Sequence, residues 1–184
     1  VRITFRGKKY NAKIRLKGDF NDHWSGSQRW SFRIKLKNGE SIYGFNRFSI
    51  QKPITRAIPN DHLFQHWLRE NGNITPRHRY ARVIFNGDSW GIMDVEEHIS
   101  KQFLELAQRK NAPIMRFLTD EDALYWKKNI DKTAPNFYGT ASKIQLYNDT
   151  AYRDDRDMLA LFSYGVDAYR QFQQGELYVG DFID

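Results

Sequence analysis

Apolar and cationic residues alternate along two segments near the start of the chain. In residues 10–17 and again in residues 30–37, an apolar residue at every second position alternates with a polar one, which is lysine or arginine from residues 12 and 32 onward. A period of two gives a β-strand one apolar face and one cationic face. We therefore predict that the two segments are antiparallel neighbours in one sheet. The helix predicted at 60–71 should cover their apolar side chains, which are Ile14, Leu16, Phe32, Ile34 and Leu36.

The same patterns predict the remaining elements. Further strands are expected at residues 2–6, 48–50, 80–85, 90–95 and 113–117, and the turn Asn86-Gly87-Asp88 joins two of them into a hairpin. Helices are expected at roughly 60–71, 97–109 and 153–173, with residues 119–150 irregular apart from one helical turn at 121–127. Strands fill the first half and helices the second. This order indicates an α+β fold, with an antiparallel sheet and one packed helix followed by a helix-rich half.

Length and composition limit the class of protein. With 184 residues, of which 40% are hydrophobic, the chain is long enough for a domain with a buried core and is not intrinsically disordered. No apolar run approaches the roughly 18 residues that a membrane-spanning helix requires. The absence of cysteine excludes disulfides, zinc–thiolate sites and cysteine nucleophiles.

Positive charge is concentrated at the start of the chain. The net charge is +7, but residues 1–37 hold eleven Lys or Arg against two Asp, a net +9, and the rest of the chain sums to −2. A nucleic-acid binder that is basic throughout would not have this distribution. Paired strands would set like charges directly opposite one another, which destabilises a sheet. Either a bound polyanion such as the phosphates of a nucleotide neutralises them, or the face is solvated or ion-paired internally with Asp154, Asp155 and Asp157.

Other polar groups have a structural and a functional interpretation, and the sequence leaves both open. The run Glu96-Glu97-His98 is expected to open a helix, where acidic residues suit the helix dipole, or to contact a ligand. His62 and His66 have the spacing of two metal ligands on a helix but lack an evident third ligand. The Walker A motif and the glycine-rich, H-R-D and D-F-G kinase motifs are missing, which excludes ordinary protein kinases and P-loop enzymes.

Three short patterns occur in a fixed order over residues 12–104. The first is Arg15-Leu16-Lys17-Gly18, followed after a polar loop by Arg29-Trp30-Ser31-Phe32-Arg33-Ile34-Lys35. The second is Phe48-Ser49-Ile50-Gln51 with a helix led by Arg56, and the third is the hairpin from Asn86 to Glu97. In this order and spacing the patterns resemble the CotH-like family of atypical kinase-fold proteins. The chain departs from the family at Asp19 and Phe20 in the loop and at Gln28 and Arg29 before the second strand.

The resemblance implies an ATP- and magnesium-dependent phosphoryl transferase with a protein substrate. It implies a kinase-N-lobe-like β-rich lobe at 1–118 and the start of an incomplete helical lobe at 119–184. The sequence does not determine the location, although a cell-surface, secreted or periplasmic one is favoured slightly over a cytoplasmic one. The cations expected to contact phosphate are Arg15, Lys17, Arg33 and Lys35, with Arg56 in support, while Glu96 and Glu97 are expected at the hinge between lobes. No catalytic residue or metal ligand is assigned. The alternative is a non-catalytic surface or coat module that docks an acidic partner on its basic face.

The resemblance also generates a first prediction, on catalysis. Family kinases carry their catalytic and metal-binding acids late, beyond the position of the helix at 153–173, and Asp181 and Asp184 are expected to be a poor substitute for them. Phosphoryl transfer needs positioned metal ions, so we expect these 184 residues to bind nucleotide at most. A radiolabelled phosphate-transfer assay with magnesium or manganese should detect no product. Transfer at the rate of a chain extended past Asp184 would contradict this expectation.

Overall fold

The computed structural model describes residues 1–18, 23–26, 29–57, 59–109, 112–119, 141–147, 150 and 152–181. The chain divides into two compact units, Val1–Gln108 and Arg109–Asp184, and each is described by itself. The lobes expected at 1–118 and 119–184 remain a prediction.

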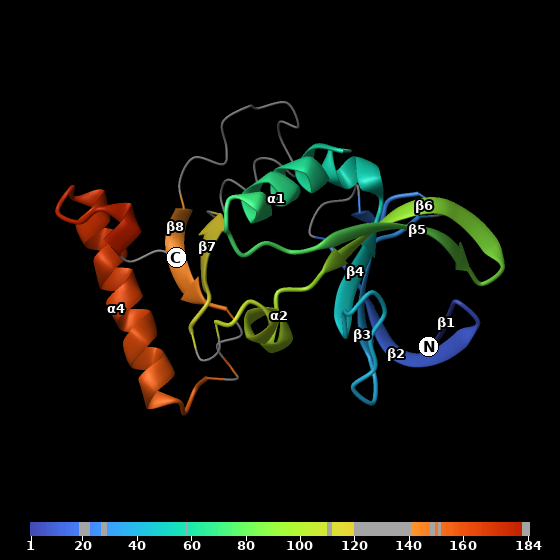
Figure 1. Cartoon of the computed structure of the whole chain (residues 1–184), viewed down its shortest axis with the longest axis horizontal. Helices are drawn as coiled ribbons and strands as arrows, with labels where there is room; N and C mark the ends of the chain where they lie inside the picture. Colours follow the sequence, from blue (N-terminus) through green and yellow to red (C-terminus); the bar gives the residue numbers. More distant parts are fainter. Residues whose placement is uncertain are drawn as a thin grey trace. The chain divides into compact units, whose positions relative to one another are not determined.

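A six-stranded antiparallel sheet forms most of the first unit (Figure 1). In sheet order its strands are β1 (Arg2–Phe5), β2 (Lys8–Leu16), β3 (Phe32–Leu36), β4 (Arg47–Gln51), β6 (Asp88–Glu97) and β5 (His78–Phe85). The predicted pairing of the two alternating segments is confirmed, because β2 and β3 are antiparallel neighbours. The predicted hairpin is confirmed as β5 and β6, and β6 also pairs with β4 in the middle of the sheet.

The register of the strands gives the sheet one apolar and one polar face. Directly opposed residues share a face, and Ile34 lies opposite both Ile14 and Phe48. The apolar face curls on itself and is closed by Ile42 and Phe45 from the connection between β3 and β4. The buried core consists of Tyr10, Ala12, Phe32, Ile34, Leu36, Ile42, Phe45, Phe48, Trp90, Met93 and Val95. Trp90 stacks on Phe32 and Phe85 in this core.

The helix α1 (Asn60–Glu70) lies on the polar face of the sheet, not on the apolar face. The His62 ring centroid is 5.7 Å from that of His78 and 5.2 Å from that of Tyr80. Both strand residues belong to the polar face, because they oppose Glu96 and Asp94 of β6. A short 3-10 helix, η2 (Pro53–Arg56), leads from β4 toward α1.

The predicted packing of α1 is therefore wrong. The apolar face is covered by the curl of the sheet and by the β3–β4 connection, so it offers no place for the helix. Leu63 and Trp67, two large apolar residues of α1, are 57% and 59% exposed. Leu16 is also exposed, because β2 ends at that residue.

The second helix of this unit, α2 (Lys101–Leu106), begins later than predicted. Strand β6 continues through Glu97 because it pairs with β4 and β5 up to residues 97 and 96. The Ser100 side chain then accepts a hydrogen bond from the backbone N–H of Phe103, which starts the helix. The run Glu96-Glu97-His98 thus closes a strand, and the prediction that it opens a helix is wrong.

The described residues of the second unit are not predominantly helical. They form a two-stranded antiparallel sheet, the helix α4 and the short 3-10 helix η4, with bounds β7 (Met115–Thr119), β8 (Ala141–Leu146), α4 (Arg156–Gln173) and η4 (Val179–Asp181). The prediction that residues 141–146 are irregular is wrong, because they pair with β7. No local pattern shows this pairing, since the two strands lie far apart in the sequence. The turn predicted at 121–127 lies outside the described residues. A mixed α/β fold is thus established, whereas a helix-rich C-terminal half is not supported.

None of the described helices combines the length and the apolarity needed to cross a bilayer.

The burial pattern predicts unequal roles for two phenylalanines. Phe48 is 2% exposed in the core, whereas Phe64 on α1 is 54% exposed. We expect Phe48→Ala to lower the free energy of unfolding by about 3–5 kcal/mol, because it leaves a cavity. Phe64→Ala removes the same atoms from a solvated site and should cost less than about 1 kcal/mol. Urea denaturation of both variants checks this, and equal losses would place α1 in the core.

Candidate functional site

A cationic groove runs across β2, β3 and β4 on the polar face. Lys13 lies directly opposite Lys35, Arg15 lies opposite Arg33, and Lys35 also lies opposite Arg47. The groove has a volume of about 440 Å³ and is lined by Lys13, Ile14, Arg15, Arg33, Lys35 and Arg47. The structure thus brings together three of the five cations expected to contact phosphate.

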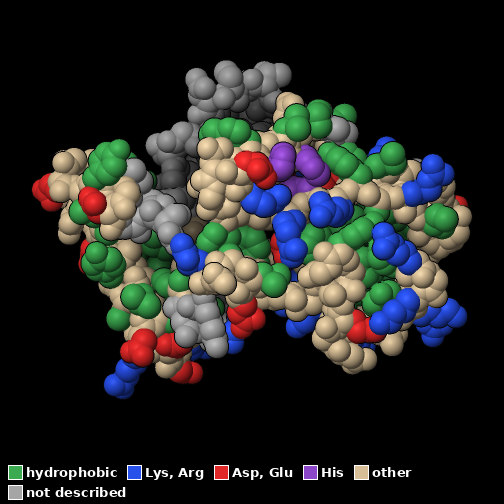
Figure 2. Space-filling model, viewed as in Figure 1, with side chains coloured by type: hydrophobic (Ala, Val, Ile, Leu, Met, Phe, Trp, Pro, Cys, Tyr) green, Lys and Arg blue, Asp and Glu red, His purple; other side chains and the backbone are tan. Residues whose placement is uncertain are grey.

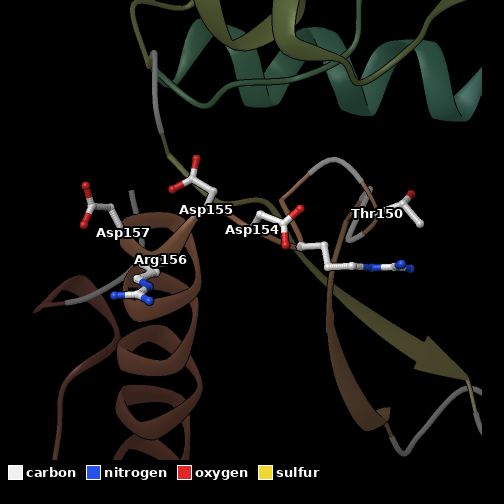
Figure 3. A pocket seen from close by; sticks show the side chains of 6 residues that line it. Thr150, Asp154, Asp155, Arg156 and Asp157 are labelled. Carbon is white, nitrogen blue, oxygen red and sulfur yellow. The ribbon is translucent and has the colours of Figure 1, made fainter.

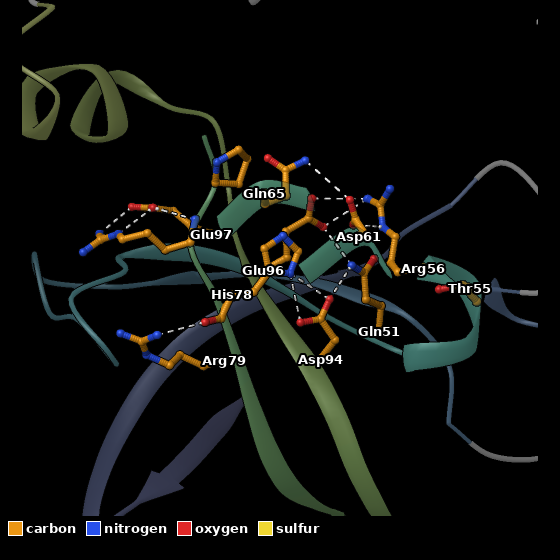
Figure 4. Close-up of polar contacts among 12 residues, drawn as sticks. Gln51, Thr55, Arg56, Asp61, Gln65, His78, Arg79, Asp94, Glu96 and Glu97 are labelled. Atoms are coloured by element: carbon orange, nitrogen blue, oxygen red, sulfur yellow. Dashed lines mark hydrogen bonds and ion pairs between the residues drawn. The ribbon is translucent and has the colours of Figure 1, made fainter. Parts of the chain in front are cut away.

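The other two expected cations, Lys17 and Arg56, meet at a single carboxylate, that of Glu96. Figure 4 shows Arg56 beside Glu96. The Lys17 ammonium donates to Glu96 and, over 3.0 Å, to Gln51 Oε1. Arg56 Nη2 lies 3.2 Å from both Glu96 oxygens. We call Lys17, Arg56 and Glu96 the Glu96 cluster. Its lysine and glutamate side chains are only 13% and 15% exposed, so water screens their attraction weakly.

A chain of hydrogen bonds fixes the Glu96 carboxylate from within the sheet. Gln51 Nε2 donates to Glu96 Oε2 over 2.9 Å and to Asp94 Oδ2 over 3.0 Å. Asp94 in turn accepts from His78 Nδ1 over 3.1 Å. Because these residues come from β4, β6 and β5, the network joins three strands across the polar face, as Figure 4 shows.

Burial and charge together shift the ionisation of this site. Burial alone would raise the pKa of Glu96, but attraction to Lys17 and Arg56 outweighs it and lowers the pKa from 4.5 to about 2. Burial lowers the pKa of Lys17, with attraction to Glu96 opposing it. His98 follows β6, and burial, followed by repulsion from Arg33 and Arg47, lowers its pKa from 6.5 to about 3. Glu96 is therefore an anion and His98 is neutral at pH 7.

Glu97, which was expected at a hinge together with Glu96, points to the other face of the sheet. It lies opposite Phe48 and pairs with Arg77, whose Nη2 and Nε are 2.7 and 2.8 Å from its carboxylate oxygens. The Arg77 guanidinium also covers the Phe45 ring, with 4.7 Å to the centroid. Only Glu96 therefore joins the expected phosphate-binding residues. A hinge role for either residue stays a prediction.

Gly18 explains part of the motif that ends β2. Its φ is +103°, a conformation that favours glycine, and a Cβ there would collide with the His23 side chain. This position therefore requires glycine. On the far side of the loop, the Ser31 N–H donates to the His23 carbonyl at 2.8 Å.

Sequence reasoning missed five polar residues of the site, which are Lys13, Arg47, Gln51, Asp94 and His78. The alternation of charge along β2 could have identified Lys13. The others become neighbours only through the strand order β3-β4-β6-β5, which no local pattern specifies.

The carboxylates at the start of α4 have a structural role. Asp155 caps the helix by accepting from the Met158 backbone N–H at 3.0 Å. Asp154, Asp155 and Asp157 line a hollow of about 640 Å³ in the second unit, where their side chains point in different directions (Figure 3). Throughout the described residues, no group of three or more His, Asp or Glu could hold a metal ion. His62 and His66 therefore have no third described ligand with which to hold a metal ion.

Comparison with known proteins adds a family match. The model of a family described as CotH kinase protein matches residues 14–184. The match begins within β2, so most of the cationic groove and the whole Glu96 cluster lie inside it. No curated protein matches the chain.

The lowered pKa values predict acid sensitivity in two separate pH windows. In the unfolded chain His98 takes up a proton below about pH 6.5, but in the folded chain it does so only near pH 3. Its contribution to the free energy of unfolding is therefore lost as the pH falls from 6.5 toward 3. Glu96 is fully stabilising above its unfolded pKa of 4.5, and its contribution is lost as the pH falls to about 2. Each group should give a slope of about 1.4 kcal/mol per pH unit inside its window.

Urea denaturation as a function of pH measures both slopes. His98→Asn should flatten the dependence between pH 6.5 and 4.5, and Glu96→Gln should flatten it below pH 4.5. If both variants retain the slopes of the original chain, other groups cause the acid sensitivity.

Proposed function

This chain belongs to the CotH kinase protein family, and we propose that its cationic groove binds the phosphates of a nucleoside triphosphate, most simply ATP, for transfer to a protein substrate. The observation that carries the proposal is the direct opposition of Arg15 to Arg33 and of Lys13 to Lys35 on neighbouring strands. Directly opposed like charges destabilise a sheet, so this face becomes more stable when an anion lies on it.

A triphosphate fits the chemistry of the groove. Arginine presents a planar fork of N–H donors that matches two phosphate oxygens at once, and lysine adds a compact charge. The groove holds both types and, at about 440 Å³, has the size of a typical ligand site. Among the residues that the structure describes, the lining of the groove includes no carboxylate that would repel the phosphates.

The Glu96 cluster supports the same proposal. In protein kinases a lysine that contacts the phosphates is held in place by a glutamate, and Lys17 and Glu96 have this pairing. Lys17 also lies within electrostatic reach of Arg33, which helps to lower its pKa. Lys17 would then contact the bound phosphates from the end of β2 while Glu96 keeps its orientation, and Arg56 would share the carboxylate.

Magnesium, which the family implies, has no matching site among the described residues. Hard divalent cations need several oxygen ligands. Two described acids on the polar face are already engaged, Glu96 by Lys17 and Arg56, and Asp94 by His78 and Gln51. No group of three or more possible ligands occurs in this part of the chain. The proposal therefore covers phosphate binding, and no step of it passes through a metal.

Binding of an ATP analogue tests the proposal. We expect Arg33→Ala combined with Lys35→Ala to weaken binding by at least about 100-fold, because a hydrogen bond to a charged group contributes about 1.5–3 kcal/mol. Isothermal titration calorimetry measures the change. The matched control is Lys8→Ala with Lys9→Ala, which removes the same charge from β2 outside the groove.

The control should weaken binding by less than about fivefold, through the overall field of the protein alone. Equal losses in the two double variants would mean diffuse electrostatic attraction and would overturn the assigned contacts. If both double variants retain binding, the nucleotide binds outside the groove.

A further inference from the structure

A second polar pocket lies between α1 and β5, apart from the cationic groove. It has a volume of about 210 Å³ and is lined by His62, His66, Arg69, His78 and Arg79. Its residues come from two elements of the first unit, and none of them lines the groove. Figure 2 shows histidine side chains gathered over α1 beside lysine and arginine side chains.

Two imidazole nitrogens in this pocket are buried without a hydrogen-bond partner. His78 is 4% exposed, and its Nδ1 must donate to Asp94, because a carboxylate only accepts. Its Nε2 then has no hydrogen-bond partner, nor has His62 Nδ1, and both residues line the pocket. Buried polar atoms in folded proteins almost always have a partner, so this pair indicates an occupant.

The charge of the lining favours an anion. Arg69 Nη2 donates to Thr75 Oγ1 and to the Pro76 carbonyl, at 3.2 and 2.9 Å, and Arg79 Nη1 donates to the His78 carbonyl at 3.1 Å. Each guanidinium has five N–H groups, more than these bonds use. A metal ion would be repelled by both arginines, and the described residues include no group of three metal ligands.

We propose that the pocket formed by His62, His78, Arg69 and Arg79 binds a tetrahedral oxyanion, either inorganic phosphate or the phosphate group of a phosphorylated side chain. The arginines neutralise its charge, and the two imidazoles bond to its oxygens. His78 keeps its proton on Nδ1 toward Asp94, so its Nε2 accepts from a protonated phosphate oxygen or, when charged, donates to an unprotonated one. The pocket holds about seven water volumes (~30 Å³ each), enough for a phosphate group with water.

Imidazole resonances provide the test. The full ¹⁵N-labelled chain is titrated at constant ionic strength with inorganic phosphate and, separately, with O-phosphoserine, with sodium chloride as the reference. The ring signals of His62 and His78 should shift with saturation, while the ring signals of His23, which does not line the pocket, should not. Saturation by both ligands means that the pocket takes phosphate monoesters generally. Saturation by only one of them identifies that source.

Variants separate this pocket from the cationic groove. His62→Gln should weaken the response of His78 at least tenfold, and since His62 lies on α1, this change avoids the fully buried His78. Arg33→Ala with Lys35→Ala should leave the response of His78 to phosphate unchanged. The test of this pocket is therefore independent of whether the groove binds a nucleotide. The proposal is overturned if neither ligand gives a saturable shift, if His62→Gln has no effect, or if zinc shifts both rings while phosphate does not.

Discussion

The packing of cation against cation on β2 and β3 is the constraint on which the rest of the first unit depends. Lys13 and Arg15 face Lys35 and Arg33 across two hydrogen-bonded strands. The opposite face of the same strands holds the register, since Ile14 and Ile34 meet in the core. A slip of one residue would move the apolar side chains into water and the cations into the core, so burial forces the cations together.

Part of this charge is neutralised within the sheet, at the end where β2 stops. Glu96 on β6 accepts from Lys17 and Arg56, and the hydrogen bonds through Gln51 hold its carboxylate in place. Removing either partner of a buried ion pair leaves an uncompensated charge, so this end of the polar face is fixed. The described lining of the groove between β2, β3 and β4 includes no such acid, and the proposed phosphate contacts lie there.

The position of α1 follows from the same division of faces. Because the apolar face closes on itself through Ile42 and Phe45, the helix is left on the polar side, where His62 contacts the rings of His78 and Tyr80. The contact surface is therefore made of imidazoles and arginines in place of aliphatic side chains, and the pocket between α1 and β5 has a positive lining. The amphipathic pattern of the helix gave no information on which face it would cover.

The sequence by itself determined the elements of the sheet, the pairing of β2 with β3 and the cationic face, because period-two alternation and a turn such as Asn86-Gly87 act over a few residues. It also identified the family through three local patterns. Only the tertiary structure decided that β6 lies beside β4, so that Glu96 reaches Lys17 and Glu97 does not. The tertiary structure also decided that residues 141–146 form the strand β8 and that α1 lies on the polar face of the sheet. In both cases long-range pairing and burial override local preference.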